Sequence, residues 1–241
     1  MSNEEKIKLL NKYIKESNNI VFFGGAGVST ESGIKDFRSK DGLYNEKYKY
    51  PPEEILSHSF FINNPKEFYK FYHDKLNCLN IEPNICHKRL VKLEHIGKLK
   101  AIITQNIDGL HQKAGSSNVL ELHGSIYENY CTKCNKSYDA KYIFKEKKIP
   151  TCTCGNIIKP NVVLYEEPLN SDIINKTIKY ISNCDLLIVA GTSLTVYPAA
   201  SFIRYFNGKH LVIINKDTTP MDNIGDLVIN DSLGNVFSKL D

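Results

Sequence analysis

Four cysteines in two close pairs are the clearest chemical feature of this chain. Two residues separate the cysteines of the first pair, one residue separates those of the second, and seventeen residues lie between the pairs. Four thiolates complete a tetrahedral zinc shell and leave no position for water, so the spacing predicts a structural zinc site. Free thiols or a redox pair are the alternatives, and a reducing cytosol disfavours the disulfide of a redox pair. The four cysteines are Cys131, Cys134, Cys152 and Cys154.

A glycine-rich turn follows an apolar run near the N-terminus. The run Ile20–Phe23 predicts a buried strand, and the segment 24–38 continues as GGAGVSTESGIKDFR. Glycine lets backbone N–H groups approach a ligand, and a helix opening after the turn would add partial positive charge that suits a pyrophosphate. The G-x-G-x-x-G fingerprint is incomplete because Thr30 stands at its third glycine. The turn indicates a phosphate or dinucleotide site, with a plain strand-to-helix turn as the alternative.

Polar side chains follow further apolar runs. In an open parallel sheet, ligands bind beyond the carboxyl ends of the strands, so these side chains predict a nucleotide crevice. A histidine at such a place can act as a base at neutral pH, although a lone histidine is more often structural, and Asn and Asp are also good turn formers. The residues are Gln105, Asn106 and Asp108 after 101–103, His123 after 119–122, Gly191, Thr192 and Ser193 after 186–190, and Asn215 after 211–214.

The elements that must position these residues alternate along the chain. A sixth apolar run, at 227–229, follows the others, and helical patterns lie between many of the runs. One begins at a Ser2–Glu5 capping box, and others cover about 85–95 and 172–182. This alternation predicts a parallel sheet with helices on both faces. Two stretches interrupt it: 39–64, which we expect to be a long functional loop, and 131–154, which is an insert.

Composition excludes several classes of protein. The chain has 241 residues, of which 41% are hydrophobic and 24% charged, which is typical of a globular protein and not of a disordered one. The net charge of +4 comes from dispersed lysines, and arginine occurs only at positions 38, 89 and 204, so direct nucleic-acid binding is not expected. Because we find no signal pattern and no apolar run long enough to cross a bilayer, we expect a cytoplasmic protein without a membrane partner.

Taken together, these segments resemble the bacterial type of the sirtuin family of NAD-dependent protein deacylases. The resemblance covers nearly the whole chain and rests on segments 25–38, 104–115, 121–125, 159–169 and 191–200 and on both cysteine pairs. It implies an α/β fold in which a Rossmann-like parallel-sheet domain carries a smaller inserted zinc-binding and helical module. The implied NAD-binding domain spans 1–38, 90–127 and 166–241, the helical module and cofactor loop 39–89, and the zinc-binding module 128–165.

The resemblance also implies an activity. NAD would be consumed as a co-substrate, Zn²⁺ would be structural, and acyl-lysine proteins or peptides would be the substrates. The products would be nicotinamide, O-acyl-ADP-ribose and free lysine, with acetyl the favoured acyl group. The alternatives are a protein mono-ADP-ribosyltransferase and a sensor that binds NAD or ADP-ribose without turnover.

The site residues carried over by the resemblance fall into four groups. His123, as general base, and Asn106 would be catalytic, and Cys131, Cys134, Cys152 and Cys154 would bind zinc. Val162, Val163 and Tyr165 would contact the substrate peptide. The cofactor would be bound by Ala26, Thr30, Phe37, Arg38, Gln105, Ile107, Asp108, Gly191, Thr192, Ser193, Asn215 and Leu233.

The chain departs from the family pattern beside the predicted peptide segment. The family has Phe-Gly-Glu where this chain has Tyr165, Glu166 and Glu167. The substitution places an additional negative charge next to the expected peptide channel. A second departure is the shortened Cys152-x-Cys154 pair.

Overall fold

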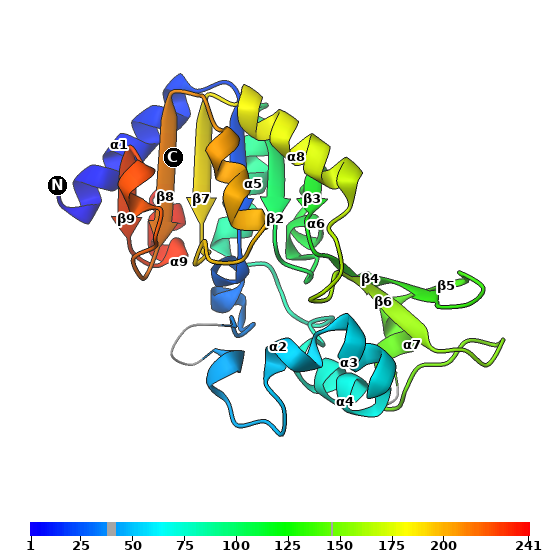
Figure 1. Cartoon of the computed structure of the whole chain (residues 1–241). Coiled ribbons are helices and arrows are strands. Elements are labelled where there is room, and N and C mark those ends of the chain that lie inside the picture. Colours follow the sequence, from blue (N-terminus) through cyan, green and yellow to red (C-terminus); the bar gives the residue numbers. More distant parts are fainter. Residues whose placement is uncertain (38–41, 146) are drawn as a thin grey trace.

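The computed structural model describes residues 1–37, 42–145 and 147–241, and a parallel sheet of six strands forms its centre. The strand order is β3-β2-β1-β7-β8-β9, and every neighbouring pair runs parallel (Figure 1). All six strands predicted from the apolar runs are present, and the α/β fold class is confirmed. The strands are β1 (Ile20–Gly24), β2 (Leu99–Thr104), β3 (Val119–Glu121), β7 (Leu186–Ala190), β8 (His210–Asn215) and β9 (Leu227–Asn230).

The sheet is covered on both faces because successive residues of its strands point to opposite sides. In β1, Ile20 and Phe22 join a core with helices α1, α5 and α9, whereas Val21 and Phe23 join a second core with α8 and the 3₁₀ helix η4. The predicted capping box at Ser2 and Glu5 starts α1. These helices are α1 (Asn3–Glu16), α5 (Ile85–His95), α8 (Ser171–Asn183), η4 (Ala199–Tyr205) and α9 (Leu233–Ser238).

The order of the strands contains a switch point. The chain enters the sheet at β1, adds β2 and β3 on one side, and then crosses to build β7, β8 and β9 on the other. The switch therefore lies between β1 and β7. Ligands of open α/β sheets bind at such a point, outside the carboxyl ends of the strands.

A smaller module adjoins the carboxyl ends of these strands. Its three-stranded antiparallel sheet has the order β5-β4-β6, and it shares an aromatic-rich core with helices α2, α3 and α4. The predicted long loop at 39–64 contains α2 and α3 in its described part, because Phe60 and Phe61 are buried against that core. The elements of the module are α2 (Pro52–Ile55), α3 (His58–Asn63), α4 (Pro65–Lys75), β4 (Gly124–Cys131), β5 (Ser137–Tyr138), α7 (Ala140–Phe144) and β6 (Ile158–Val162). Helix α6 (Leu110–Ala114) lies instead beside α5 and the parallel sheet.

Figure 1 shows the strands of the large sheet pointing toward α2, α3 and α4, with the sheet of β4, β5 and β6 extending to one side. The module boundaries given from the sequence remain a prediction.

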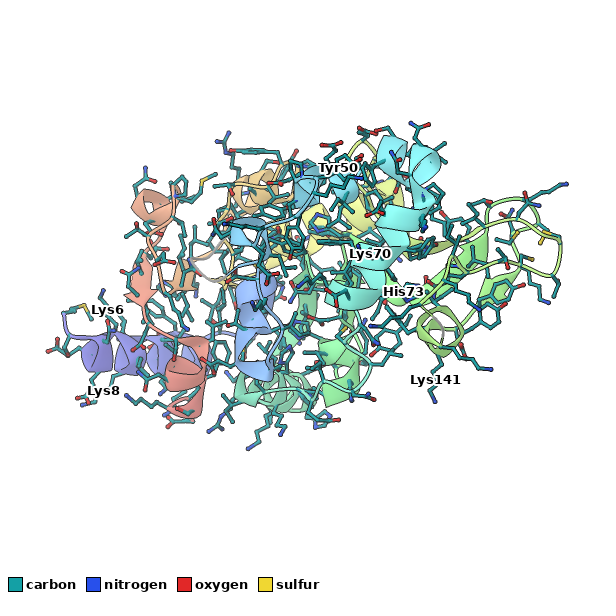
Figure 2. All side chains as sticks on the ribbon, turned by 90° about the horizontal axis from the view of Figure 1, so that it is seen from below. Lys6, Lys8, Tyr50, Lys70, His73 and Lys141 are labelled. Carbon is teal, nitrogen blue, oxygen red and sulfur yellow. The ribbon has the colours of Figure 1, made fainter. Side chains whose placement is uncertain are left out.

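Figure 2 shows Lys6 and Lys8 at one end of the molecule and Lys141 at the other, in keeping with dispersed positive charge. In the described residues, every helix is too short or too polar to cross a bilayer.

Candidate active site

The glycine-rich turn packs its backbone against the end of β7, at the switch point. The N–H of Gly25 donates to the carbonyl of Ala190 (3.2 Å), and the N–H of Gly27 donates to that of Gly191 (2.8 Å). A Cβ on Gly27 would lie 2.8 Å from Gly191 Cα, so glycine is needed for this approach. The N–H of Ala26 has no acceptor among the described residues and remains available to a ligand.

The helix expected after the turn is replaced by two single-turn 3₁₀ helices, η1 (Ala26–Val28) and η2 (Thr30–Ser32). Gly33 ends η2 with φ of 93°, a conformation that side chains of L-residues rarely adopt, so the chain turns away before an α-helix can form. The hydroxyl of Thr30 donates to the carbonyl of Gly27 (3.0 Å). A long helix dipole therefore does not contribute at this site, and individual backbone and side-chain groups must hold any phosphate.

A buried hydrogen-bonded group joins the turn to the segment that follows β2. The hydroxyl of Ser29 donates to Asp108 Oδ2 (2.6 Å) and accepts from Asn106 Nδ2 (3.1 Å). Asp108 Oδ1 also accepts from the N–H of Leu110 (2.9 Å). Ser29, Asn106 and Asp108 are all buried, so the sequence-predicted residues Asn106 and Asp108 lie together and are fixed by a third residue.

Gln105 connects the predicted base to the other side of the switch point. Its side-chain Nε2 donates to Thr192 Oγ1 (3.0 Å), and its backbone carbonyl lies 2.9 Å from Nδ1 of His123. A carbonyl only accepts, so Nδ1 of His123 carries the hydrogen and Nε2 presents its lone pair in the neutral ring. Nε2 has no hydrogen-bond partner among the described residues. His123 therefore has the tautomer that a general base requires.

The other predicted cofactor residues on the β7 and β8 side lie at the same edge of the sheet. Gly191 has φ of 59°, and the hydroxyl of Ser193 contacts that of Thr195 (2.8 Å). Asn215 closes β8, where its Nδ2 donates to the carbonyl of Asp217 (2.9 Å). Leu233 is buried at the start of α9.

Two predicted cofactor residues belong instead to the aromatic-rich core of the small module. Phe37 and Ile107 are both half-buried against that core, and the ring of Phe37 lies 5.4 Å from the ring of Tyr44. Arg38 lies outside the described residues.

The predicted substrate segment runs between the two modules. Val162 ends β6 opposite Gly124, and the N–H of Val163 donates to the carbonyl of His123 (2.9 Å). On the other side, the N–H of Tyr165 donates to Leu56 (2.9 Å) and its carbonyl accepts from His58 (3.0 Å). The segment is therefore in contact with the predicted base on one side and with the helical module on the other.

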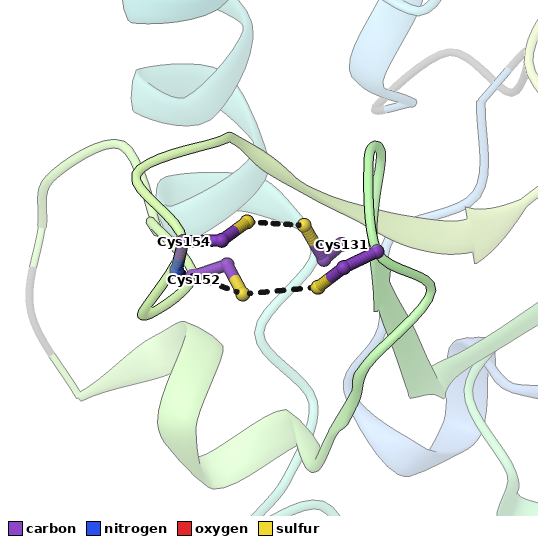
Figure 3. A group of neighbouring side chains, drawn as sticks. Cys131, Cys152 and Cys154 are labelled. Carbon is purple, nitrogen blue, oxygen red and sulfur yellow. Dashed lines mark hydrogen bonds between the residues drawn. The ribbon is translucent and has the colours of Figure 1, made fainter.

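The four cysteines of the two pairs converge as predicted (Figure 3). All four sulfur atoms lie within 4.8 Å of one another; Cys131 and Cys154 are 3.4 Å apart, and Cys134 and Cys152 are 3.5 Å apart. Zn–S bonds of about 2.3 Å in a tetrahedron place sulfur atoms roughly 3.8 Å apart, so the geometry fits zinc. Because all four positions would be filled by protein, the ion would be structural.

Burial shifts the titration of several side chains at the site. It lowers the pKa of His123, which keeps the ring neutral near pH 7 although the Gln105 carbonyl opposes this shift. Burial raises the pKa of Asp108, and hydrogen bonds from Ser29, Leu110 and Asn106 oppose the rise. Burial also raises the pKa of Glu121 to about 7.

Two residues of the site, Ser29 and Asn84, were not predicted from the sequence. Ser29 lies within the glycine-rich turn, but a hydroxyl there is equally typical of an ordinary turn. Asn84 caps α5 and donates from Nδ2 to the carbonyl of Val28 (2.8 Å), which holds the turn from behind. An Asn immediately before a helical pattern was a signal for the cap, but not for the long-range contact.

The arrangement fits a nicotinamide dinucleotide in its donor set. Backbone N–H and hydroxyl groups suited to phosphate lie at the ends of β1 and β7, an amide lies at the end of β8, and a buried carboxylate and amide lie after β2. Ala26 N–H and His123 Nε2 are polar groups without protein partners among the described residues. Such a site can bind a dinucleotide and move a proton at His123.

Comparison with known proteins gives a consistent result. A family model described as the Sir2 family matches residues 25–198. The NAD-dependent protein deacetylase of Clostridium perfringens is 59% identical over 98% of this chain and 99% of its own length. A solved Sir2 structure with deacetylated p53 peptide and 3′-O-acetyl-ADP-ribose has a TM-score of 0.88, 39% identity and 96% coverage of both chains. Another, of Sir2 with p53 peptide and NAD⁺, has a TM-score of 0.85 and 38% identity, covering 97% of this chain and 96% of the other.

Proposed function

This chain belongs to the Sir2 (sirtuin) family, and we propose that it is an NAD-dependent protein lysine deacetylase. An acetyl-lysine side chain, NAD and one water molecule are converted to free lysine, nicotinamide and O-acetyl-ADP-ribose. The observation that supports this most strongly is His123, whose ring is held as the Nδ1–H tautomer beside a segment suited to bind a peptide. The match to the Sir2 family model and the identity to the deacetylase relative confirm the family resemblance seen in the sequence.

NAD, when bound, supplies the acceptor for the acyl group, because loss of its nicotinamide leaves a reactive ribose carbon. Ala26, Thr30 and Arg38 would hold it from the glycine-rich turn. Gln105, Ile107 and Asp108 would surround the nicotinamide side, with Phe37 shielding the reactive carbon from water. Gly191, Thr192, Ser193, Asn215 and Leu233 would hold the phosphate and adenosine side.

The protein residues contribute positioning and proton transfer. His123 would accept a proton at Nε2 from a ribose hydroxyl, while the carbonyl of Gln105 stabilises the Nδ1–H that keeps the ring oriented. Asn106, fixed to Ser29, would hold its amide in a constant position during the reaction. Val162, Val163 and Tyr165 would contact the substrate peptide, and the backbone groups of 163–166 that are not bonded within the protein would pair with it as an added strand.

Cys131, Cys134, Cys152 and Cys154 would hold zinc, and the ion would take no part in the reaction. It would supply structural stability and no open coordination position. The N–H groups of Lys133 and Cys154 lie 3.4 and 3.5 Å from Cys131 Sγ and Cys152 Sγ, respectively, and orient the two sulfur atoms.

Mass spectrometry of the products tests this function. The purified protein is mixed with NAD and with acetyl-, succinyl- or myristoyl-lysine peptides of one sequence. We expect deacylated peptide together with nicotinamide and O-acyl-ADP-ribose, and the highest yield from the acetyl peptide. Nicotinamide release with ADP-ribosylated protein and intact acyl-lysine would establish a mono-ADP-ribosyltransferase instead. NAD that binds and is never cleaved would establish a sensor.

A further inference from the structure

Two consecutive glutamates tie the proposed substrate segment to the start of helix α3. Glu167 Oε2 accepts from Lys159 Nζ (3.0 Å) and from the N–H of Leu164 (2.9 Å), and Oε1 lies 2.8 Å from Nδ1 of His58. The side chain of Lys159 is only 8% exposed, and its Nζ also contacts the carbonyl of Val162 (3.0 Å). Glu167 thus closes the turn after β6 onto a buried cation.

Glu166 contacts the next residue of helix α3, Ser59. Its Oε2 accepts from the N–H of Ser59 (2.8 Å) and its Oε1 from the hydroxyl of Ser59 (2.9 Å). Both oxygens of one carboxylate are therefore bound by one residue of the helix. Ser59 lies in the first turn of α3, where backbone N–H groups have no partner within the helix.

The backbone of Glu166 has an unfavourable conformation at this contact. Its φ is 75°, in the left-handed region that glycine tolerates and residues with a Cβ rarely adopt. Such strain persists where surrounding contacts compensate for it, and it is concentrated at ligand-binding segments. The two bonds to Ser59 are contacts of this kind made by the Glu166 side chain, and backbone bonds of Tyr165 and Glu167 hold the residues on either side.

The contact between Glu166 and Ser59 lies next to a backbone bridge that holds the proposed substrate segment. Tyr165, the residue before Glu166, is bonded through its backbone to Leu56 and His58, on either side of the short bridge between Ser57 and Tyr165. Glu166 extends this bridge by one residue into α3. The segment 162–166 is consequently tied to His123 at one end and to the helical module at the other.

We propose that Glu166 is a positioning residue for the substrate peptide. By fixing the segment 163–166 against α3, it keeps the backbone that would pair with the peptide in a single conformation. Glu166 acts through this backbone and not on the reacting atoms. The proposal rests on the deacetylase function, and it predicts that Glu166 governs peptide affinity rather than the chemical step.

Steady-state kinetics with an acetyl-lysine peptide test the proposal. Glu166→Ala should raise KM for the peptide roughly tenfold, as expected for loss of a hydrogen-bonded carboxylate. Ser59→Ala removes only the hydroxyl bond and keeps the N–H bond to Glu166, so it should raise KM by a smaller factor. The value of kcat and the KM for NAD should stay unchanged. The double variant should be no worse than Glu166→Ala, because Glu166→Ala already removes both bonds to Ser59. Fluorescence anisotropy of a labelled peptide should show the same loss of affinity.

Two further variants separate the carboxylate contact from other effects. Glu53→Ala is the matched control, since it removes an exposed carboxylate of α2 that has no hydrogen bond or ion pair among the described residues; its kinetics should equal those of the wild type. Glu166→Gly removes the side chain and relieves the backbone strain, and it should also weaken peptide binding. Zinc content and thermal unfolding confirm that each variant is folded.

Several results would overturn the proposal. Wild-type peptide affinity in Glu166→Ala would do so. Reduced affinity in Glu166→Ala with wild-type affinity in Glu166→Gly would also overturn it, because the loss would then come from backbone strain and not from the missing carboxylate. A loss of kcat with unchanged KM would place Glu166 in the chemical step instead. Failure of the function itself is distinct, because the wild-type protein would then leave acetyl-lysine intact.

Discussion

Ser29 is the residue at which the two proposed cofactor segments meet. Its hydroxyl donates to Asp108 and accepts from Asn106. One buried hydroxyl is therefore hydrogen-bonded both to a residue proposed to lie beside the nicotinamide and to a proposed catalytic residue. Asp108 is only 6% exposed, and an ionised carboxylate with so little water must be compensated by donors. Ser29 provides one of the donors, although the sequence pattern marks it only as part of a turn.

Replacing Ser29 by alanine should weaken both folding and cofactor binding. Asp108 would lose one donor, and we expect about 1–3 kcal/mol less free energy of unfolding and a higher KM for NAD. Ser32→Ala is the control, because the buried hydroxyl of Ser32 has no partner among the described residues. Urea denaturation and NAD titration measure the two effects. Equal stability of Ser29→Ala and Ser32→Ala would show that the Ser29 bond to Asp108 contributes nothing.

At the scale of elements, the small module depends on zinc more than the large sheet does. Both cysteine pairs lie in the small module, whereas the parallel sheet has two cores of its own. Cys131 and Cys152 are buried in the core that the small module shares with α2, α3 and α4. Four thiols held within 4.8 Å without an ion would lack the bonds that hold the two cysteine-bearing segments together.

Removal of zinc should unfold the small module and leave the parallel sheet folded. In zinc-finger peptides the metal contributes about 10–16 kcal/mol, so its loss is not compensated by the remaining contacts. Cys134→Ser and exhaustive chelation should both abolish bound zinc and the hydrogen-exchange protection of β4 and β6. Lys133→Ala, an exposed neighbour in the same turn, should retain zinc. A zinc-free protein with normal protection and activity would refute this dependence.

The sequence predicts the large sheet well and the small module poorly, for a physical reason. A run such as Leu186–Ala190 is buried on both faces of the sheet, so its apolar character is visible without knowledge of its neighbours. Helix α3 is stabilised by Phe60 and Phe61 against a core that includes Val162, about a hundred positions away in the chain. The contact between Glu166 and Ser59 is equally long-range. Zinc was predictable because the cysteine spacing itself records the ligand geometry.

At the scale of the whole molecule, two buried histidines link acidity to stability. His87 of α5 and His111 of α6 are 0% and 1% exposed, and their ring centroids are 4.7 Å apart. Burial lowers the pKa of His87 to about 4, and it also lowers the pKa of His111, with the neighbouring His87 adding to that shift. The folded protein therefore keeps both rings neutral where the unfolded chain would protonate them.

The free energy of unfolding should consequently fall as the solution is acidified. The unfolded chain binds protons near pH 6.5 whereas folded His87 does so only near 4, so stability present above pH 6.5 is lost as the pH falls toward 4. The shift of His87 alone corresponds to about 3 kcal/mol. Glu121, whose pKa is raised to about 7, acts in the opposite direction, because its protonated form is favoured by folding.

Urea denaturation between pH 7.5 and 4.5 measures this dependence. Glu121→Gln removes the opposing carboxyl, so its free energy of unfolding should decline more steeply with acidification than that of the wild type. His95→Gln, at an exposed position of α5, should follow the wild-type curve. A flat curve for Glu121→Gln would contradict the assignment of neutral, buried His87 and His111.

The most direct test of the proposed chemistry is the stoichiometry of one reaction mixture, measured for the wild type and for His123→Ala. Nicotinamide, deacetylated peptide and O-acetyl-ADP-ribose are quantified together, and NAD binding is measured separately. We expect equal amounts of the three products from the wild type. We expect at least about a hundredfold slower turnover from His123→Ala, which should still bind NAD. Unchanged deacetylation by His123→Ala, or nicotinamide released from the wild type while acetyl-lysine stays intact, would contradict an NAD-dependent deacetylase with His123 as its base.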